Sequence, residues 1–462
     1  MLFSGIPFLF YFLPAVLILY FLVPSKLKNS VLLLCSLVFY AWGEPNYVLL
    51  MLVSILLYYS LGLGIGRTRF RCTFLTLSVI VGIGMLAIFK YADFFISSVN
   101  ELTGTALPLL KLALPIGISF YTFQCMSYTI DVYRGHTAPQ KNLIDFGTYV
   151  ALFPQLIAGP IVRYVDVAQE LRQRENRWSN IVEGLPRFLV GLGKKVLLAN
   201  QFGLLTELFR STSQPSVLFY WMYAIAFTLH IYFDFSGYSD MAIGLGRIFG
   251  FHFPENFDYP YLSGSITEFW RRWHMTLGGW FRDYAYIPLG GSRVSRGRWV
   301  INILIVWMLT GLWHGAAWNF VLWGLLYAAM LLLEKWIPGL KKLPCVLRHG
   351  YVLLVTVLGF VLFNATDLTQ AADDFAGLFG LSSLPAVTAE TWYYLRSYAP
   401  LFVMGIIGAT PVLKLLRQKL YAYPLGQKCL AVAEPAAMAV LLLICTAYLV
   451  DGSFNPFLYF RF

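Results

Sequence analysis

Residues 300–333 read VINILIVWMLTGLWHGAAWNFVLWGLLYAAMLLL, a run of 34 residues without Asp, Glu, Lys or Arg. As one straight helix this run would extend for about 50 Å, because each residue adds about 1.5 Å. The hydrocarbon core of a bilayer is only about 30 Å thick. The run therefore predicts insertion into a membrane, and it also predicts a helix that breaks or bends within the stretch.

The favoured place for the break is TGLWHG at 310–315, where Gly311 and Gly315 bracket Trp313 and His314. Glycine permits unusual backbone angles and close approach of neighbouring chains. Discontinuous helices that hold a titratable group are a common way to build central sites in membrane proteins. His314 is therefore a functional candidate, and the alternative is a core histidine that only hydrogen-bonds a neighbouring helix.

The composition of the whole chain agrees with a membrane protein. Of its 462 residues, 58% are hydrophobic and 12% are charged, whereas soluble domains carry about 25% charged residues. The net charge of +11 is expected to reflect Lys and Arg in cytoplasmic loops rather than a nucleic-acid partner. The six cysteines form no CxxC pair, so we expect neither a disulfide framework nor a metal site.

The apolar segments predict an all-α integral membrane protein with about ten to twelve transmembrane helices, forming one polytopic domain over 1–462. The first segment is interpreted as a retained span rather than a signal peptide, because it lacks a basic leader and a convincing cleavage site. The candidate spans are 3–23, 30–43, 47–66, 73–96, 112–130, 146–162, 196–209, 217–233, 300–333, 351–366, 398–413 and 435–450.

Basic residues in the loops set the expected orientation. Lys and Arg at 24–29 and 67–72 place both loops in the cytoplasm and the N-terminus outside. The apolar run at 146–162 is flanked by basic residues on both sides, at 134–141 and at 163–177. If this run crossed fully, the two flanking loops could not both be cytoplasmic. A re-entrant or in-plane segment near 143–160 resolves the conflict, and Pro154 and Pro160 favour an irregular helix there. Residues 163–178 are expected to form a charged connector helix.

A second unusual segment, SITEFWRRWHMTLGGWFRDYAYIPLGGSR at 265–293, mixes ionisable residues with tryptophans. It lies in 251–299, the least hydrophobic long stretch of the chain. We expect it to be interfacial or partly inserted and to line a polar cavity. If it is helical, His274 and Arg282 lie near the same face, since they are eight residues apart. The alternative is an interfacial anchor with snorkelling arginines.

A third segment, HIYFDFSGYSDMAIGLGR at 230–247, places Asp234 and Asp240 in apolar surroundings. A buried carboxylate is costly unless it is paired. Arg247 and the basic residues at 271–282 are the possible partners. A structural ion pair is favoured for Asp234 over a direct role as a general base.

Together these segments resemble the membrane-bound O-acyltransferase family, in the branch that contains the membrane subunit of bacterial alginate O-acetylation. The resemblance runs nearly from end to end. One departure is Asn364, where this branch is expected to have arginine. The motifs that carry the resemblance are LPIGISFYTFQCMSYTIDVYRG (114–135), FPQLIAGPIVRY (153–164), IYFDFSGYSDMAIGLGRIFGF (231–251), FWRRWHMTLGGWFRDYAYIPLGGSR (269–293), TGLWHGAAWNFVLWGLLYA (310–328) and SFNPFLYFRF (453–462).

The resemblance implies membrane helices, with re-entrant or interfacial helices, around a central tunnel in a bacterial inner membrane. It implies that an acyl thioester such as acetyl-CoA enters from the cytoplasm as a substrate, without a tightly bound cofactor. It implies a polysaccharide acceptor outside and an extracytoplasmic SGNH-type acetyltransferase partner. Transfer to the polymer directly or through that partner is left open. The family's invariant histidine matches His314, and its second position matches His274.

The chemistry fits these residues, since a hydroxyl that attacks a thioester needs a base poised near neutral pH. Our hypothesis is that His314 accepts the hydroxyl proton, while His274 orients the acceptor or steadies developing charge. The expected substrate-binding residues are Trp273, Arg282, Asp283, Trp313, Asn319 and Asp234.

Two other functions are weighed against this hypothesis. One is a polysaccharide or lipid transporter or flippase with His314 in a proton relay, but such transporters have paired broken helices and the sequence offers only one. The other is a structural scaffold for a polymer synthase. The ionisable residues within apolar runs count against it.

Overall fold

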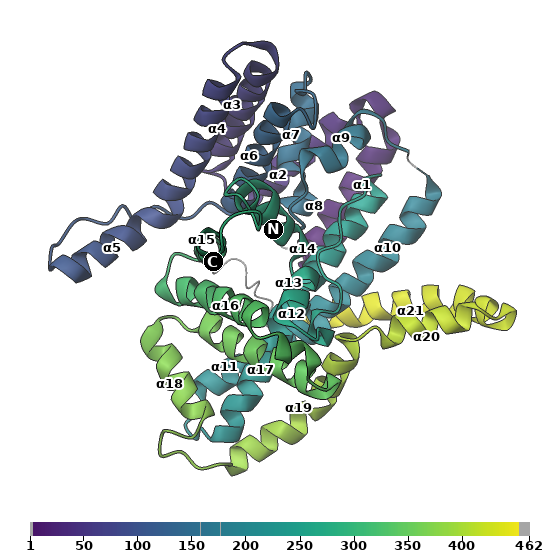
Figure 1. The fold of residues 1–462 in the computed structure, drawn as a ribbon. Helices are drawn as coiled ribbons and strands as arrows, with labels where there is room; N and C mark the ends of the chain where they lie inside the picture. Colours follow the sequence, from purple (N-terminus) through teal and green to yellow (C-terminus); the bar gives the residue numbers. More distant parts are fainter. Residues whose placement is uncertain (1–2, 158, 176, 452–462) are drawn as a thin grey trace. The chain divides into compact units, whose positions relative to one another are not determined.

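The computed structural model describes residues 3–157, 159–175 and 177–451, and every regular element in these ranges is a helix (Figure 1). The all-α prediction is therefore confirmed for this part of the chain. The motif at 453–462 lies outside the described residues.

Six helical segments of the described chain are long and apolar enough to cross a membrane. A seventh is formed if α19 (Ala389–Gly408) and α20 (Val412–Tyr421), which are bent by 59°, count as one span. The six are α3 (Val48–Arg67), Arg71–Thr103 (α4, η3 and α5), Trp178–Ser211 (α10, η4 and α11), α12 (Val217–Ile248), α17 (Cys345–Asn364) and α21 (Pro424–Val450).

This count is lower than the ten to twelve crossings expected from apolar length alone. Several expected spans form helices shorter than 18 residues, for example α2 (Lys28–Gly43), with 16 residues, and α6 (Ile118–Arg134), with 17. Nearly all side chains of α6 are buried within the protein. Apolar length alone therefore does not separate segments buried within the protein from complete spans, and ten to twelve crossings stays a prediction.

The expected irregularity near 143–160 is present. Helix α7 (Leu143–Ala151) stops at Leu152, and the four-residue helix α8 (Phe153–Leu156) follows with Pro154 in its first turn. The charged connector is present as α9 (Tyr164–Arg172), which buries Tyr164, Val167 and Leu171 on one face.

The predicted break in 300–333 falls between α15 (Arg296–His314) and α16 (Trp318–Trp336), with Gly315 in extended backbone after His314. Glycine allows the two helices to approach closely. A methyl group on Gly311 would meet the carbonyl oxygen of Phe320, and one on Gly324 would meet that of Trp307. His314 is thereby held at the end of a tightly packed helical hairpin.

The contacts divide the chain into two compact units. Unit 1 comprises Met1–Phe188, Ser239–Glu255 and Arg282–Tyr284, and unit 2 comprises Leu189–Tyr238, Asn256–Phe281 and Ala285–Phe462. Both units take residues from α12, so the division does not follow the chain order. That the chain forms one polytopic membrane domain stays a prediction.

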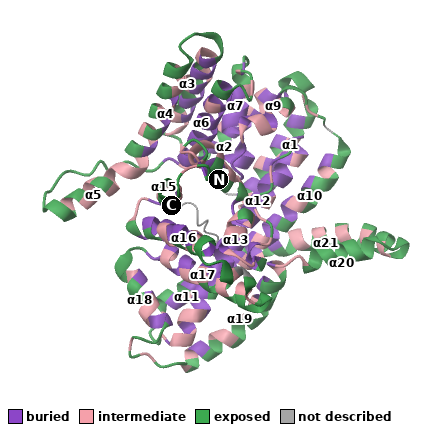
Figure 2. Ribbon diagram, viewed as in Figure 1, coloured by how far each residue is buried: buried purple, intermediate pink, exposed green. Residues whose placement is uncertain are grey.

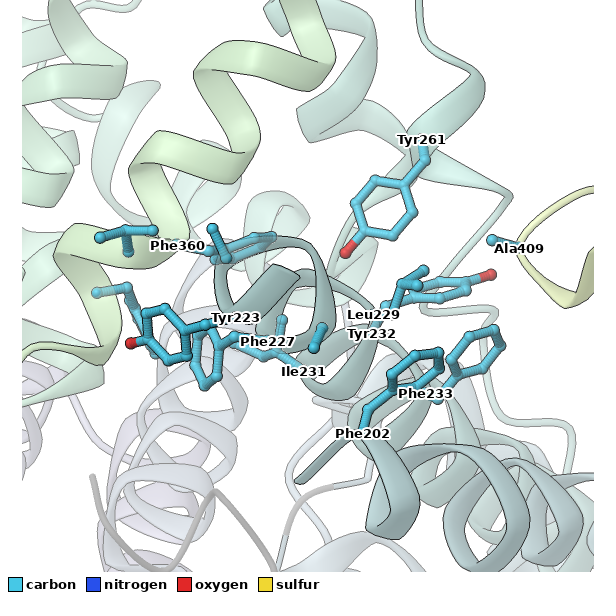
Figure 3. Close-up of a cluster of buried hydrophobic side chains, with 14 of the residues drawn as sticks. Phe202, Tyr223, Phe227, Leu229, Ile231, Tyr232, Phe233, Tyr261, Phe360 and Ala409 are labelled. Atoms are coloured by element: carbon cyan, nitrogen blue, oxygen red, sulfur yellow. The ribbon is translucent and has the colours of Figure 1, made fainter. Parts of the chain in front are cut away.

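The core of unit 2 is built around the first part of α12 (Figure 3). Tyr223, Phe227 and Ile231 of this helix belong to one buried cluster with Phe360 of α17 and Phe202 of α11. Between helices in a membrane, such a cluster is held together by van der Waals packing of the side chains. The cluster fixes the helices that carry the site described below.

Helix α21 shows the opposite pattern of burial (Figure 2). Cys445 is its one buried residue. Since a long apolar helix needs an apolar environment, the exposed surface of α21 is that expected of a helix in contact with lipid.

Candidate active site

The imidazole of His314 is enclosed by aromatic rings from three helices. Its centroid lies 5.0 Å from that of Trp313, 5.0 Å from that of Trp323 on α16 and 5.3 Å from that of Phe363 on α17. All three rings meet it nearly edge to face, and His314 is 5% exposed. The site therefore gives His314 a fixed orientation in apolar surroundings.

His274 lies at a second chain break, between α13 (Ile266–Arg272) and α14 (Met275–Phe281). Its ring centroid is 4.6 Å from that of Phe235 on α12 and 5.8 Å from that of Trp313. Both histidines therefore contact the same tryptophan within unit 2. His274 lies outside the candidate spans, and burial, followed by the charge of His314, lowers its pKa well below the usual value. The imidazole is thus kept neutral near pH 7.

The expectation that His274 and Arg282 lie near the same face was conditional on a helix that includes both residues. This condition is not met, because His274 lies outside the helices, with a left-handed φ of +43° between α13 and α14. A helix cannot continue through that backbone conformation. His274 belongs to unit 2, whereas Arg282 and Asp283 belong to unit 1.

Arg282 and Asp283 take part in an ion network of unit 1. The Asp283 carboxylate accepts hydrogen bonds from Arg163 at 3.0 Å and from Arg282 at 2.8 Å. Arg163 also pairs with Asp166 at 3.0 Å. The Arg282 side chain is 66% exposed, compared with 20% for Asp283. Binding of substrate by either residue stays a prediction, while the contacts give Asp283 a structural role.

We expect Asp283→Ala to lower activity more than Arg282→Ala does, because loss of the carboxylate leaves the half-buried Arg163 without one of its two partners. Arg296→Ala is the control, because Arg296 is an exposed arginine at the first position of α15. The measurement is acyl transfer in membranes at matched protein levels. Equal, small effects at all three positions would contradict the role given to the network.

Asp234 forms a buried ion pair with Lys195 in unit 2. Its Oδ1 lies 2.5 Å from Lys195 Nζ, and both side chains are at most 2% exposed. The structural pairing is confirmed, but the expected partners were wrong. Arg247 pairs instead with Glu183 at 2.6 Å, and Arg272 of the basic cluster pairs with Glu268 at 2.7 Å. Lys195 was missed because it lies at the edge of an apolar run, where lysine usually snorkels to the surface.

The remaining predicted residues have structural contacts. Trp273 is 3% exposed and packs against the rings of Phe257, Phe269 and Phe360. The Asn319 amide donates to the carbonyl oxygen of Ala365 at 2.8 Å, which satisfies a backbone group at the C-terminus of α17.

Asn364, which replaces the arginine expected in this branch, adjoins an ion pair. Its amide donates to the Tyr223 hydroxyl at 2.7 Å, and Arg210 donates to the same oxygen at 2.6 Å. Arg210 in turn pairs with Asp374 at 2.6 Å. An ion pair is therefore present beside Asn364, and Arg210 supplies its positive charge.

Asn256 is the residue of this site that the sequence interpretation missed. It is fully buried, and its Oδ1 lies 3.0 Å from Nδ1 of His274. The only sequence signal was its place in the polar stretch at 251–299, within PENFDYPY at 254–261.

Comparison with known proteins identifies the family. The model of the MBOAT, membrane-bound O-acyltransferase family, matches residues 109–366, more than half of the chain. The chain belongs to the membrane-bound O-acyltransferase family. It is a multi-pass membrane enzyme that transfers an acyl group to oxygen.

Several relatives align over most or all of the chain. It is 38% identical to a probable alginate O-acetylase AlgI of Azotobacter vinelandii, over 100% of both chains. It is 43% identical to that of Pseudomonas aeruginosa, over 83% of this chain and 76% of the relative. It is 31% identical to the peptidoglycan O-acetyltransferase of Helicobacter pylori, over 100% of this chain and 98% of the relative. These relatives favour an acyltransferase over the transporter and scaffold functions.

Proposed function

We propose that this protein takes an acetyl group from cytoplasmic acetyl-CoA and delivers it across the membrane for O-acetylation of an extracytoplasmic polysaccharide. The observation that carries the proposal is the placement of His314 and His274 against the ring of Trp313, in a chain whose full-length relatives are named for alginate and peptidoglycan O-acetylation. Transfer occurs to the polymer directly or to an SGNH-type acetyltransferase partner outside.

In the proposed reaction, a hydroxyl oxygen attacks the thioester carbonyl carbon, and His314 accepts the hydroxyl proton. The new C–O bond forms as the C–S bond breaks, and the departing CoA thiolate takes up a proton to become the free thiol. His274, whose ring also contacts Trp313, orients the acceptor.

A tunnel between the two membrane faces is part of the proposal, because acetyl-CoA is too large and too highly charged to cross lipid. We infer that its pantetheine arm reaches His314 from the cytoplasm. We further infer a bacterial inner membrane as the location. About ten to twelve crossings, with re-entrant segments such as α7 and α8, remain the proposed topology.

We expect donor use to be confined to one face of the membrane, the face that bears Arg67, Arg69 and Arg71 at the turn from α3 to α4. The measurement uses purified protein in liposomes of known orientation, with radiolabelled acetyl-CoA added inside or outside. A single-cysteine variant that keeps the exposed Cys72 reports orientation through an impermeant thiol reagent. Equal use of donor from both faces would contradict the tunnel.

A further inference from the structure

Asn256 makes hydrogen bonds to three consecutive residues at the break that carries His274. Its backbone oxygen accepts from the Met275 amide at 3.0 Å. Its Oδ1 accepts from the Thr276 amide at 3.3 Å and from the Thr276 hydroxyl at 2.9 Å, and it lies 3.0 Å from His274 Nδ1. A non-glycine residue keeps a left-handed backbone only where its surroundings over-determine it, and Asn256 supplies such restraints.

These contacts fix which end of the Asn256 amide faces His274. A backbone N–H can only donate a hydrogen bond, so the side-chain atom that the Thr276 N–H meets must be the carbonyl oxygen. An amide oxygen can only accept, so Nδ1 of His274 must donate to it and must carry the proton. In a neutral imidazole the lone pair is then on Nε2.

The Nε2 atom of His274 is buried and has no hydrogen-bond partner among the described residues. His274 is 1% exposed, with the rings of Phe235 and Trp313 beside it. Buried polar atoms in native proteins are nearly always hydrogen-bonded. This unfilled acceptor, beside the Trp313 ring that His314 also contacts, is therefore the place for a hydrogen-bond donor that the described part of the chain does not supply.

We propose that Asn256 is a positioning residue that holds His274 with its proton on Nδ1, so that Nε2 accepts a hydrogen bond from a hydroxyl group of the acceptor other than the attacking one, whose single proton goes to His314. This inference rests on the proposed function and deepens it. An unprotonated Nε2 has a lone pair but no hydrogen that it could donate to an oxyanion. The inference therefore assigns His274 to orientation of the acceptor rather than to stabilisation of negative charge. It also names the recognised group, a hydroxyl donor.

The first test reads the tautomer without relying on catalysis. The protein is labelled with ¹⁵N at its six histidines, reconstituted in bilayers near pH 8, and examined by solid-state NMR. The His274 signals are assigned by difference from His274→Asn. We expect a protonated Nδ1 and an unprotonated Nε2 in the wild-type chain, and a changed or mixed tautomer in Asn256→Leu. A proton on Nε2 in the wild type, or the same tautomer in Asn256→Leu, would overturn the proposal.

The second test uses Asn256→Asp, which keeps the size and the acceptor atoms. A carboxylate beside Nδ1 stabilises the imidazolium and raises the His274 pKa. Activity requires an unprotonated Nε2. As the pH is lowered, Asn256→Asp is therefore expected to lose activity at a higher pH than the wild type does. The acidic limb of the kcat/KM profile is expected to move upward by about one pH unit or more, with little change in KM for acetyl-CoA. The elements of unit 2 around His274 carry other charged or titratable groups: His314 on α15, His230 and Asp234 (paired with Lys195) on α12, Glu268, Arg271 and Arg272 on α13, and Asp258 beside Asn256.

Asn302→Ala is the matched control. Asn302 is also a fully buried asparagine of unit 2, and its amide donates to the carbonyl oxygens of Leu289 and Gly291 at 3.1 Å each. We expect it to keep the wild-type pH profile even where it lowers the amount of protein. An unshifted acidic limb in a folded Asn256→Asp would contradict the positioning role. A wild-type chain with the expected tautomer but no acyl transfer would contradict the proposed function instead.

Discussion

Replacing His314 by glutamine is expected to leave a protein that inserts and folds but transfers acyl groups about 10²–10⁴-fold more slowly. Glutamine approximates the size of imidazole and offers hydrogen bonds, yet its amide does not accept a proton near neutral pH. His314→Ala is expected to lose activity to the same extent. The measurement is the rate of acyl transfer in membranes that contain equal amounts of each variant.

His274 provides the comparison for this result. His274→Asn is expected to keep more activity than His274→Ala, because asparagine still accepts a hydrogen bond and His274 is not asked to take the proton. If His314 were only a core residue that hydrogen-bonds a neighbouring helix, the protein would instead keep much of its activity with glutamine at this position. Near-normal transfer by a well-folded His314→Gln would sink the assignment of the base.

The second large effect concerns the ion pair between Lys195 and Asp234. Removing either charge alone is expected to destabilise the fold by about 3–5 kcal/mol, because the other charge is left buried without its counter-ion. The double variant Lys195→Met/Asp234→Leu is expected to recover most of that loss, since apolar pairs of similar volume often replace buried ion pairs. The measurement is thermal unfolding of the detergent-purified protein.

The exposed pair between Arg417 of α20 and Glu434 of α21 is the control. Its side chains are 63% and 40% exposed, so removing Glu434 is expected to change stability by no more than about 1 kcal/mol. Equal effects at the two pairs, or a double variant that is worse than both single ones, would contradict the structural role of Lys195 and Asp234.

The sequence predicted the elements that follow from local chemistry. The uncharged run at 300–333 was too long for one span, and Gly311 and Gly315 marked where it breaks. The prolines near 154–160 similarly marked an interrupted helix. These predictions succeeded because a glycine or proline acts on the backbone within a few residues of itself.

Long-range partners could not be predicted in the same way. Lys195 and Asp234 lie 39 positions apart in the sequence, and no local pattern joins them. The left-handed backbone at His274 was also hidden, because the residue that restrains it, Asn256, belongs to a separate segment. The number of spans is also hard to predict from the sequence, because apolar length does not distinguish a side chain facing lipid from one buried in protein.

The central claim is that this protein splits a thioester on one side of the membrane and delivers the acyl group toward the other. The most direct measurement follows both products in liposomes that contain alginate oligosaccharides on the far face and doubly labelled acetyl-CoA on the near face. The account predicts one free CoA thiol on the near face for each acetyl ester formed on the far face, with both products lost in His314→Gln. Intact acetyl-CoA on the far face, or ester formation that does not depend on His314, would contradict it.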